Sequence, residues 1–344
     1  MLGSDTRLEI LRRLRRLAEI PRGSLAGEIG TLYAVDAVWR GSTPLDEMAG
    51  SEAVLKKVWL PLLAAFPDLE RRDLIFVGGE DRGHALVAAM GHYCGTFAGD
   101  YLGIPATGKV AMLRFGEVHE LQGGRIVRST CLWDLLDLMR QAGVWPLAPS
   151  LGVEGPWPGP LTGDGLVLHD TSPAESAASL AQTLAMHQTL LGYDDFAGRG
   201  RQGLLDMPQK QHWHPRMMWY GPAGIGTTRG LAGFVDHHQV PFRTAFPLGR
   251  PEAAVSRPGE HMIRLGDGCY SVTGGWPSRR LMHLGGGWLG MPATGKEISM
   301  RVMDFYLHHE GLIRENWVPI DIIHVLQQMG LDVFARMREM LGRR

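Results

Sequence analysis

LGIPATGK, at Leu102–Lys109, returns with one substitution as LGMPATGK at Leu289–Lys296. Sliding the chain by 187 positions aligns residues 102–144 with residues 289–331 without a gap, and 13 of these 43 pairs are identical. Farther upstream, an Ala-Phe-Pro triplet and several Trp, Gly and Pro positions repeat at an offset of 180. A period this long that occurs only twice indicates a duplicated domain rather than a solenoid.

The bulk composition is typical of a soluble globular protein. At 344 residues, the length alone suggests about two domains. Hydrophobic residues make up 44% and charged residues 21%, and the formal net charge is −1. This balance excludes the basic footprint of a nucleic-acid-binding protein and a polybasic membrane anchor. We therefore expect neither a nucleic-acid partner nor a membrane partner.

Local features at the N-terminus and at the cysteines point to the cytoplasm. The first dozen residues include several charged side chains and contain no apolar core of a signal peptide. Cys94, Cys131 and Cys269 have no metal-ligand spacing, which favours reduced thiols. The basic run from Arg12 to Arg16 is interpreted as the solvated face of a helix.

Apolar periodicity predicts the same order of elements in both copies. In the first copy it predicts helices over 6–20, 51–66 and 135–142 and strands over 32–39, 73–77, 85–93, 110–121 and 125–133. In the second copy it predicts helices over 174–191, 230–246 and 322–341 and strands over 213–220, 261–265, 270–273, 298–309 and 312–318. Helices that precede a run of strands are typical of an α+β fold, here a curved antiparallel sheet wrapped around helices.

Two domains joined by a linker follow from this order. We expect the first domain over residues 1–145 and the second over residues 173–344. Residues 146–172 between them are rich in proline and glycine, which predicts an extended linker that is not packed.

The repeated octapeptide only partly matches a phosphate-binding loop. A P-loop needs Ser or Thr after its lysine, and a helix whose N-terminus meets the phosphates. Here Val110 and Glu297 follow the two lysines, and an alternating strand follows them. We therefore interpret both octapeptides as turns between strands.

Asp134 and its counterpart Asp321 each end a strand and precede the closing helix of their copy. Aspartate at this place is a favoured helix N-cap, which is one interpretation. The other is catalysis, because a carboxylate beside an apolar pocket has a raised pKa and can exchange protons with a carbonyl substrate. The residues alone leave both open.

Glu117 and Asp304 form a second matched pair of acids. Strand alternation places Asp304 on one face with Ile298, Met300, Val302, Tyr306 and His308, and it places Glu117 among apolar residues and His119. Such an acid either lines a pocket or is buried against a structural arginine.

Histidine is concentrated in the second copy, where eleven of the fourteen residues follow position 160. A zinc site is one interpretation, but no clean set of ligands with supporting acids accompanies it. Surface or hydrogen-bonded histidines are the alternative, and we expect no metal and no cofactor.

Most of both copies resembles the SnoaL-like polyketide cyclase family of the nuclear-transport-factor-2-like superfamily, and the resemblance is most specific in the last third of each copy. The resemblance rests on the PATGK turn, the alternating strand after it, the stretch Glu310–Trp317, Asp321 and the sequence Gln327-Gln328-Met-Gly. It implies two α+β cone domains, each with a deep apolar pocket and no cofactor.

The resemblance also implies roles for particular residues. An acid near the final helix would act as general acid/base in an aldol ring closure, and this role falls to Asp321 and Asp134. The family motif Glu-x-Trp is kept in the second copy as Glu315 and Trp317, whereas the first copy has Arg and Thr there. Four further residues of the second copy are candidate donors to a ligand: Tyr306, His308, Trp219 and His214. The candidate ligand-binding acids and histidine beside them are Asp304, Glu117 and His119.

Three functions fit these observations. The first is a cofactor-free enzyme acting on a small apolar carbonyl substrate, by cyclisation, isomerisation or hydrolysis. The second is a binding protein for a small apolar ligand, and the third is an interaction scaffold. Because a fused pair of copies can replace a dimer, we expect a monomer with an internal pseudo-dimer, or a homodimer of it.

Overall fold

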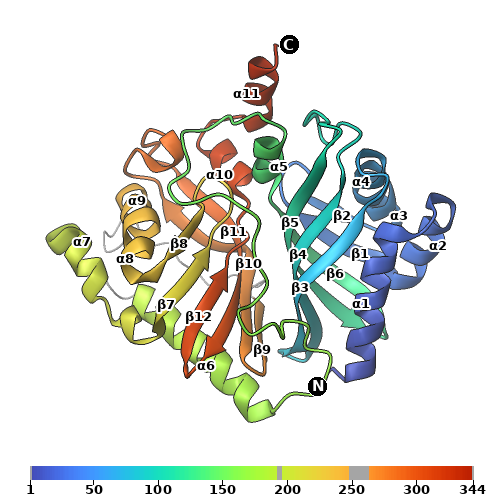
Figure 1. The fold of residues 1–344 in the computed structure, drawn as a ribbon, viewed down its shortest axis with the longest axis horizontal. Coiled ribbons are helices and arrows are strands. Elements are labelled where there is room, and N and C mark those ends of the chain that lie inside the picture. Colours follow the sequence, from blue (N-terminus) through green and yellow to red (C-terminus); the bar gives the residue numbers. More distant parts are fainter. Residues whose placement is uncertain (1, 192–195, 248–262, 343–344) are drawn as a thin grey trace. The chain divides into compact units, whose positions relative to one another are not determined.

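The computed structural model describes residues 2–191, 196–247 and 263–342 (Figure 1). Contacts between Cα atoms divide the chain into two compact units. Unit 1 comprises Met1–Pro146, Pro156–Asp170 and Val333–Arg344. Unit 2 comprises Leu147–Gly155 and Thr171–Asp332.

Unit 1 contains a six-stranded sheet in the order β2-β1-β6-β5-β4-β3. Its strands are β1 (Tyr33–Gly41), β2 (Glu47–Ala49), β3 (Glu70–Asp81), β4 (His84–Thr96), β5 (Val110–Gln122) and β6 (Arg125–Trp133). Its helical elements are α1 (Ser4–Glu19), α2 (Arg22–Leu32), α3 (Ser51–Val54), the π-helical turn η1 (Leu55–Trp59), α4 (Leu60–Ala65), α5 (Leu135–Gln141) and α11 (Val333–Met340). Helix α1 lies against β3, and α2 and α3 lie against β1.

Unit 2 repeats the same sheet in the order β8-β7-β12-β11-β10-β9. Its strands are β7 (Trp213–Tyr220), β8 (Thr227–Arg229), β9 (Ile263–Asp267), β10 (Tyr270–Met282), β11 (Glu297–His309) and β12 (Leu312–Trp317). Its helical elements are α6 (Pro173–Leu191), α7 (Phe196–Asp206), η2 (Pro208–Gln211), α8 (Gly230–Phe234), the π-helical turn η3 (Val235–Gln239), α9 (Val240–Ala245), η5 (Trp288–Gly290) and α10 (Ile322–Gln328). The two matching topologies confirm the α+β fold and the duplication.

Most strand pairs are antiparallel, as expected, but each sheet also contains one parallel pair. Strand β1 pairs in parallel with β6, and β7 pairs in parallel with β12. The other pairs are antiparallel. Parallel strands need a long connection between them. The elements between the first and the last strand of each copy supply it, because they return the chain to the end of the sheet at which the first strand began.

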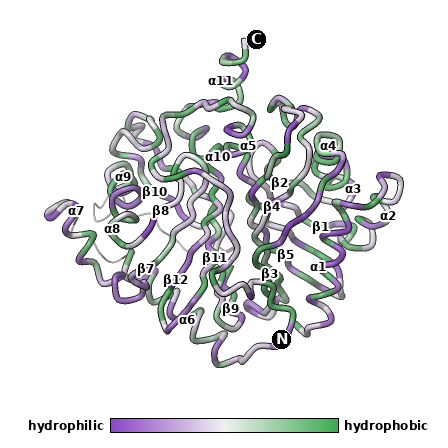
Figure 2. The backbone as a smooth tube through the Cα atoms, in the orientation of Figure 1, coloured by the Kyte–Doolittle hydropathy of each residue, from purple (hydrophilic) through white to green (hydrophobic). Residues whose placement is uncertain are grey.

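The helices lie where the spacing of apolar residues predicts them, but a glycine divides the closing helix of the second copy. Hydrophilic and hydrophobic residues alternate along α1, whose apolar side is buried (Figure 2). The predicted helix over 322–341 is wrong, because it is divided into α10 and α11. Gly330 lies between them with φ 99°, a conformation that ends a helix and that glycine adopts at little cost.

Of the predicted strand over 261–265, residues 261 and 262 lie outside the described residues.

Both octapeptides lie in connections between strands, as predicted. Residues 102–109 connect β4 to β5, and the Phe97 carbonyl accepts hydrogen bonds from the Thr107 and Gly108 amides. Residues 289–296 occupy the same place between β10 and β11. No helix N-terminus follows the lysine in either copy, and this geometry excludes a P-loop.

The proline-rich segment is extended but also packed, which its composition did not indicate. In unit 1, Trp157 and Val167 are buried, and the Arg114 guanidinium lies 5.0 Å from the Trp157 ring centre. In unit 2, Val153 forms a β-bridge with Thr227. The segment is therefore part of the two folded units rather than a free spacer.

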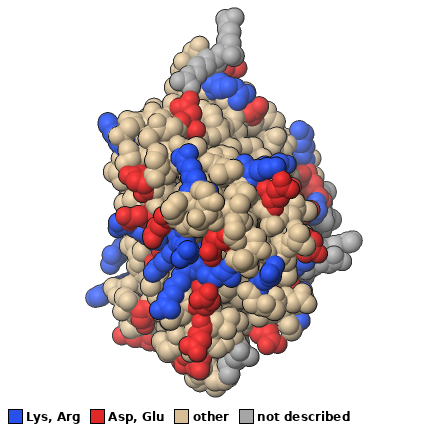
Figure 3. Space-filling model, turned by 90° about the vertical axis from the view of Figure 1, so that its right-hand side faces the viewer, with Lys and Arg blue, Asp and Glu red and all other residues tan. Residues whose placement is uncertain are grey.

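The arginines of α1 contribute to a surface of mixed charge. Arg13 and Arg16 pair with Glu28, and Arg15 pairs with Asp73. Figure 3 shows Lys and Arg side chains interspersed with Asp and Glu on one face of the molecule. Among the helices of the described ranges, none has the length and apolar composition needed to cross a bilayer.

Candidate functional site

Unit 2 contains a cavity of about 150 Å³ between its sheet and its helices. Strands β7, β10, β11 and β12 contribute to its walls, as do α6, η3 and α9. Most of the lining is apolar, and four aromatic side chains dominate it: Trp213, Trp219, Phe234 and Phe242. Trp219 stacks on the ring of His238, with 4.2 Å between the ring centres. The cavity is thus suited to a small, flat, apolar body.

Asp304 is the only carboxylate that lines this cavity among the described residues. It lies in the middle of β11, on one face with Met300, Val302 and Tyr306, which also line the cavity, as strand alternation predicts. Burial raises the pKa of the Asp304 carboxyl to about 6, although the Asn316 amide, 3.4 Å from Oδ1, acts in the opposite direction. An acid with this pKa can both accept and donate a proton near neutral pH.

Several neutral hydrogen-bonding groups share the cavity wall with this acid. The Tyr306 hydroxyl lies 2.8 Å from Nε2 of His187. Burial lowers the pKa of His187 to about 3 and that of His238 to about 3, so both rings are uncharged near neutral pH. Burial and the Asp304 charge hold the Tyr306 pKa well above its ordinary value. Tyr306 can therefore donate a hydrogen bond to a ligand oxygen at any physiological pH.

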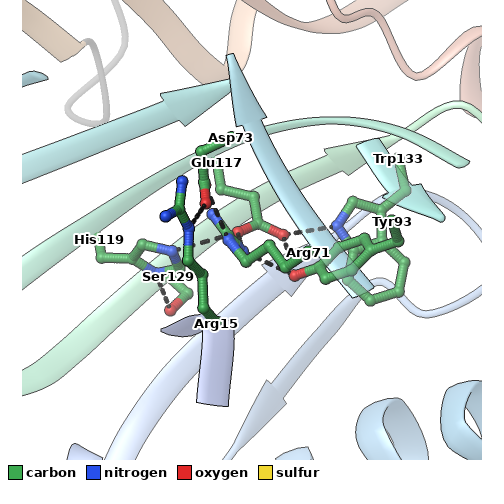
Figure 4. Close-up of polar contacts among 8 residues, drawn as sticks. All are labelled: Arg15, Arg71, Asp73, Tyr93, Glu117, His119, Ser129 and Trp133. Carbon is green, nitrogen blue, oxygen red and sulfur yellow. Dashed lines mark hydrogen bonds and ion pairs between the residues drawn. The ribbon is translucent and has the colours of Figure 1, made fainter. Parts of the chain in front are cut away.

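In the corresponding region of unit 1, buried side chains contact the matched acid and one another (Figure 4). Glu117, the counterpart of Asp304, accepts hydrogen bonds from Arg71 at 2.5 Å, Tyr93 at 3.0 Å and Trp133 Nε1 at 2.8 Å. Nε2 of His119 lies 3.4 Å from the same carboxylate. Burial alone would raise the Glu117 pKa, but Arg71 and His119 outweigh it and hold the pKa below the ordinary range. Glu117 is thus a fixed structural anion.

Three substitutions between the copies explain why one region is open and the other filled. In unit 1, Tyr93 packs edge-on against Trp59 and Trp133, with ring centres 6.0 and 5.2 Å apart. The sheet registers and the two offsets align these rings with three cavity-lining residues of unit 2: Arg279, Gln239 and Ile320. Replacing two indoles by an amide and an aliphatic side chain removes the atoms that fill unit 1.

Asp134 and Asp321 are helix N-caps in the structure. Asp134 accepts a hydrogen bond from the Asp137 amide at 3.0 Å, and Asp321 accepts one from the His324 amide at 3.1 Å. Each also pairs with an arginine, Asp134 with Arg114 at 2.8 Å and Asp321 with Arg301 at 3.0 Å. Asp321 is only 1% exposed and does not line the cavity. This geometry favours the capping interpretation for both residues.

The Asp321 cap gives a stability prediction. Asp321→Ala should lower the free energy of unfolding by about 2 kcal/mol, because it removes both the cap and the partner of Arg301. Asp321→Asn should cost less, because asparagine also caps helices. Urea denaturation of the two variants measures the difference. A large loss of activity in Asp321→Asn at native stability would instead assign Asp321 to the chemistry.

Four other candidates of the second copy lie away from the cavity. Glu315 and Trp317 point to the opposite face of β12 from Asn316, where Glu315 accepts a hydrogen bond from Tyr220 at 2.9 Å and Trp317 stacks on the Tyr220 ring. The remaining two form local contacts. His308 bonds to Thr183 and Gln182 of α6, and His214 lies 3.4 Å from Glu310. Of the predicted ligand-binding residues of this copy, the cavity brings together Asp304, Tyr306 and Trp219.

Sequence reasoning missed six polar residues of the cavity: His187, His238, Gln239, Arg243, Arg279 and Asn316. The signal for Asn316 was present, because it is the middle residue of the Glu-x-Trp motif and alternation places it on the other face. Arg279 lies beyond the predicted end of its strand, and His187 reaches the site only through the packing of α6. Within the described residues, no group of three or more His, Cys, Asp or Glu side chains is placed to hold a metal ion.

Comparison with known proteins identifies the family model that matches unit 1. Residues 13–142 match the model of the SnoaL-like polyketide cyclase family, which agrees with the resemblance seen in the sequence. No curated protein matches the chain. 

Several solved structures from Streptomyces are similar to one copy. IdmH from Streptomyces antibioticus is 23% identical with a TM-score of 0.34, over 40% of this chain and 99% of IdmH. AclR from Streptomyces galilaeus is 23% identical with a TM-score of 0.34, over 41% of this chain and 98% of AclR. TsrD from Streptomyces laurentii is 18% identical with a TM-score of 0.34, over 42% of this chain and 98% of TsrD.

Proposed function

We propose that the chain is a cyclase-type protein whose chemistry takes place in its second copy. The match of residues 13–142 to the model of the SnoaL-like polyketide cyclase family supports the cyclase-type function. The reaction is acid/base chemistry without a cofactor on a small apolar carbonyl compound. The first copy, whose corresponding region is filled, has a structural role.

One observation carries this proposal: Asp304 is a carboxyl group with a pKa near 6 in the wall of an apolar cavity. A carboxylate that is poorly solvated is a stronger base than one in water. The nearby Tyr306 hydroxyl supplies a neutral hydrogen-bond donor for charge that develops on an oxygen. Base and donor on one strand face suit proton removal next to a carbonyl group.

The proposed step transfers one proton and forms one carbon–carbon bond. The Asp304 carboxylate takes a proton from the carbon beside a carbonyl, and the electron pair of the broken C–H bond forms an enolate. Tyr306 donates a hydrogen bond to the enolate oxygen. The enolate carbon then attacks a second carbonyl carbon of the same molecule, and the resulting alkoxide receives the proton from Asp304.

The size of the cavity limits the substrate. A volume of about 150 Å³ holds roughly one six-membered ring. The proposed substrate class is therefore a dicarbonyl compound that closes to a body of about one ring.

The pH dependence of the reaction tests the role of Asp304. Proton abstraction needs the carboxylate form, so the rate should rise about tenfold per pH unit below pH 6 and level off above it. His187 and His238 stay neutral throughout this range, because both have a pKa of about 3. Deuterium exchange at the α-carbon of cyclohexanone, followed by NMR between pH 4.5 and pH 8, measures the profile. A rate with no inflection between pH 5 and pH 7 would contradict the assignment.

A further inference from the structure

Arg279 is a cation in the cavity wall for which the fold supplies no anionic contact. Within residues 2–191, 196–247 and 263–342, its guanidinium has no hydrogen bond and no ion pair within 4.0 Å. Three buried arginines each have a carboxylate partner: Arg71 binds Glu117, Arg114 binds Asp134 and Arg301 binds Asp321. Arg243, which also lines the cavity, donates a hydrogen bond to the Leu190 carbonyl at 2.8 Å. A half-buried cation that lacks an anion in a mainly apolar wall is costly to a fold, so its retention there points to a ligand.

Asp304 does not fill this role. The charges of Arg279 and Asp304 influence each other, but the two groups are not within ion-pair distance. Burial lowers the pKa of Arg279 and raises that of Asp304, and their mutual attraction does not offset either effect. A close ion pair would shift both values the other way. Space for the oxygen atoms of a ligand therefore remains beside the guanidinium.

The backbone places Arg279 at this wall through an irregularity in β10. The pairing of β10 with β11 shifts between Gly275 and Arg279, and regular pairing resumes where Arg279 lies opposite Met300. In unit 1 the position opposite the equivalent Leu113 is Tyr93, whose ring is packed in the filled region. The second copy therefore has a cation where the first has part of its core.

The residues of the cavity wall favour a carboxylate over a phosphate as the anion that pairs with Arg279. One guanidinium offers two parallel N–H donors, which match the two oxygens of a carboxylate. A phosphate dianion would need several donors, whereas the rest of the wall is mainly apolar, with Trp213, Trp219 and Phe242 among its residues. The other guanidinium of the wall, that of Arg243, donates a hydrogen bond to the Leu190 carbonyl at 2.8 Å. The aromatic rings of the wall and the volume of about 150 Å³ suit a flat body of roughly one ring.

We infer that the cavity of unit 2 binds a small cyclic monocarboxylate, whose carboxylate pairs with Arg279 and whose ring packs among the aromatic walls. This inference rests on the proposed site but concerns binding alone, so it can fail or succeed independently of the proposed chemistry. Combined with that chemistry, it makes the substrate class a dicarbonyl compound that also carries a carboxylate.

Binding of benzoate and of its neutral analogue benzamide tests the inference. The full chain should bind benzoate at least tenfold more tightly than benzamide in isothermal titration calorimetry. Arg279→Gln should remove this preference. Arg280→Gln is the matched control and should keep it, because Arg280 is exposed and pairs with Glu297 at 3.3 Å on the surface.

Each other outcome has a defined meaning. Equal binding of benzoate and benzamide, binding of neither, or unchanged benzoate binding in Arg279→Gln would overturn the inference. If Arg279→Gln does not fold, Arg279→Lys should still prefer benzoate, although by less, because lysine keeps the charge without the paired donors. Benzoate binding without proton transfer by Asp304 would leave the inference standing and reject the proposed chemistry.

Discussion

Asp304→Asn should reduce proton transfer at least 100-fold while the protein stays folded. The substitution keeps the size of the side chain and removes the only carboxylate that lines the cavity among the described residues. A positioned general base contributes roughly 10²- to 10⁴-fold to a rate, so a loss of this size is expected. The measurement is deuterium exchange into cyclohexanone at pH 8, compared with the native chain under the same conditions.

The same variant should be more stable than the native chain at pH 8. Since the folded-state pKa of Asp304 is raised, its contribution to folding is fully present below about pH 4 and is lost as pH rises through about 6. At pH 8 the native fold therefore carries a poorly solvated carboxylate, which asparagine removes. We expect a gain on the order of 2 kcal/mol in the free energy of unfolding at pH 8 and little gain at pH 4.

A loss of activity that accompanies a gain in stability distinguishes a functional acid from a structural one. Asp321→Asn serves as the matched control, because it changes another buried aspartate of unit 2 that pairs with Arg301 outside the cavity. The control should keep proton transfer and lose stability. Exchange in Asp304→Asn at the native rate would show that another group is the base.

Glu117→Gln should destabilise unit 1 by about 3 kcal/mol without affecting proton transfer. Glu117 is 2% exposed and accepts hydrogen bonds from Arg71, Tyr93 and Trp133. A neutral amide leaves the Arg71 charge incompletely compensated and offers a single acceptor oxygen to these donors. Removing one partner of a buried ion pair costs about 3–5 kcal/mol, and the remaining contact of Arg71 with Asp73 places the expected value at the lower end.

Glu120→Gln on the same strand is the control for this prediction. Glu120 pairs with Arg128 and His84, both of which are exposed, and surface pairs of this kind contribute at most about 1 kcal/mol. Urea denaturation followed by circular dichroism compares the two variants. Equal stability of Glu117→Gln and Glu120→Gln would contradict a structural role for the buried network.

Much of the fold was predictable because strand alternation and helix periodicity are local signals. The pattern over 298–309 placed Asp304 and Tyr306 on one face, and the structure confirms it. The parallel pairing of β1 with β6 could not be predicted, because register between distant strands leaves no local pattern. The division of the closing helix at Gly330 was missed, since isolated glycines also occur inside helices.

The site was less predictable than the fold because it depends on packing. Asp321 matches the expected position of a catalytic acid, yet only the structure shows its bonds to the His324 amide and to Arg301. The strand that carries Arg279 was predicted to end at Thr273, because two glycines and a proline follow. Those residues belong to the irregular part of β10 that brings Arg279 to the cavity.

The titration of the Asp304 carboxyl carbon, followed by NMR on protein labelled with ¹³C-aspartate, tests the central claim most directly. It needs no substrate, and the signal is assigned by its absence in Asp304→Asn. The account predicts a pKa of about 6 for this carboxyl, raised by burial in the cavity wall. A pKa near the ordinary aspartate value of about 3.9 would show a well-solvated carboxylate and contradict the proposed site.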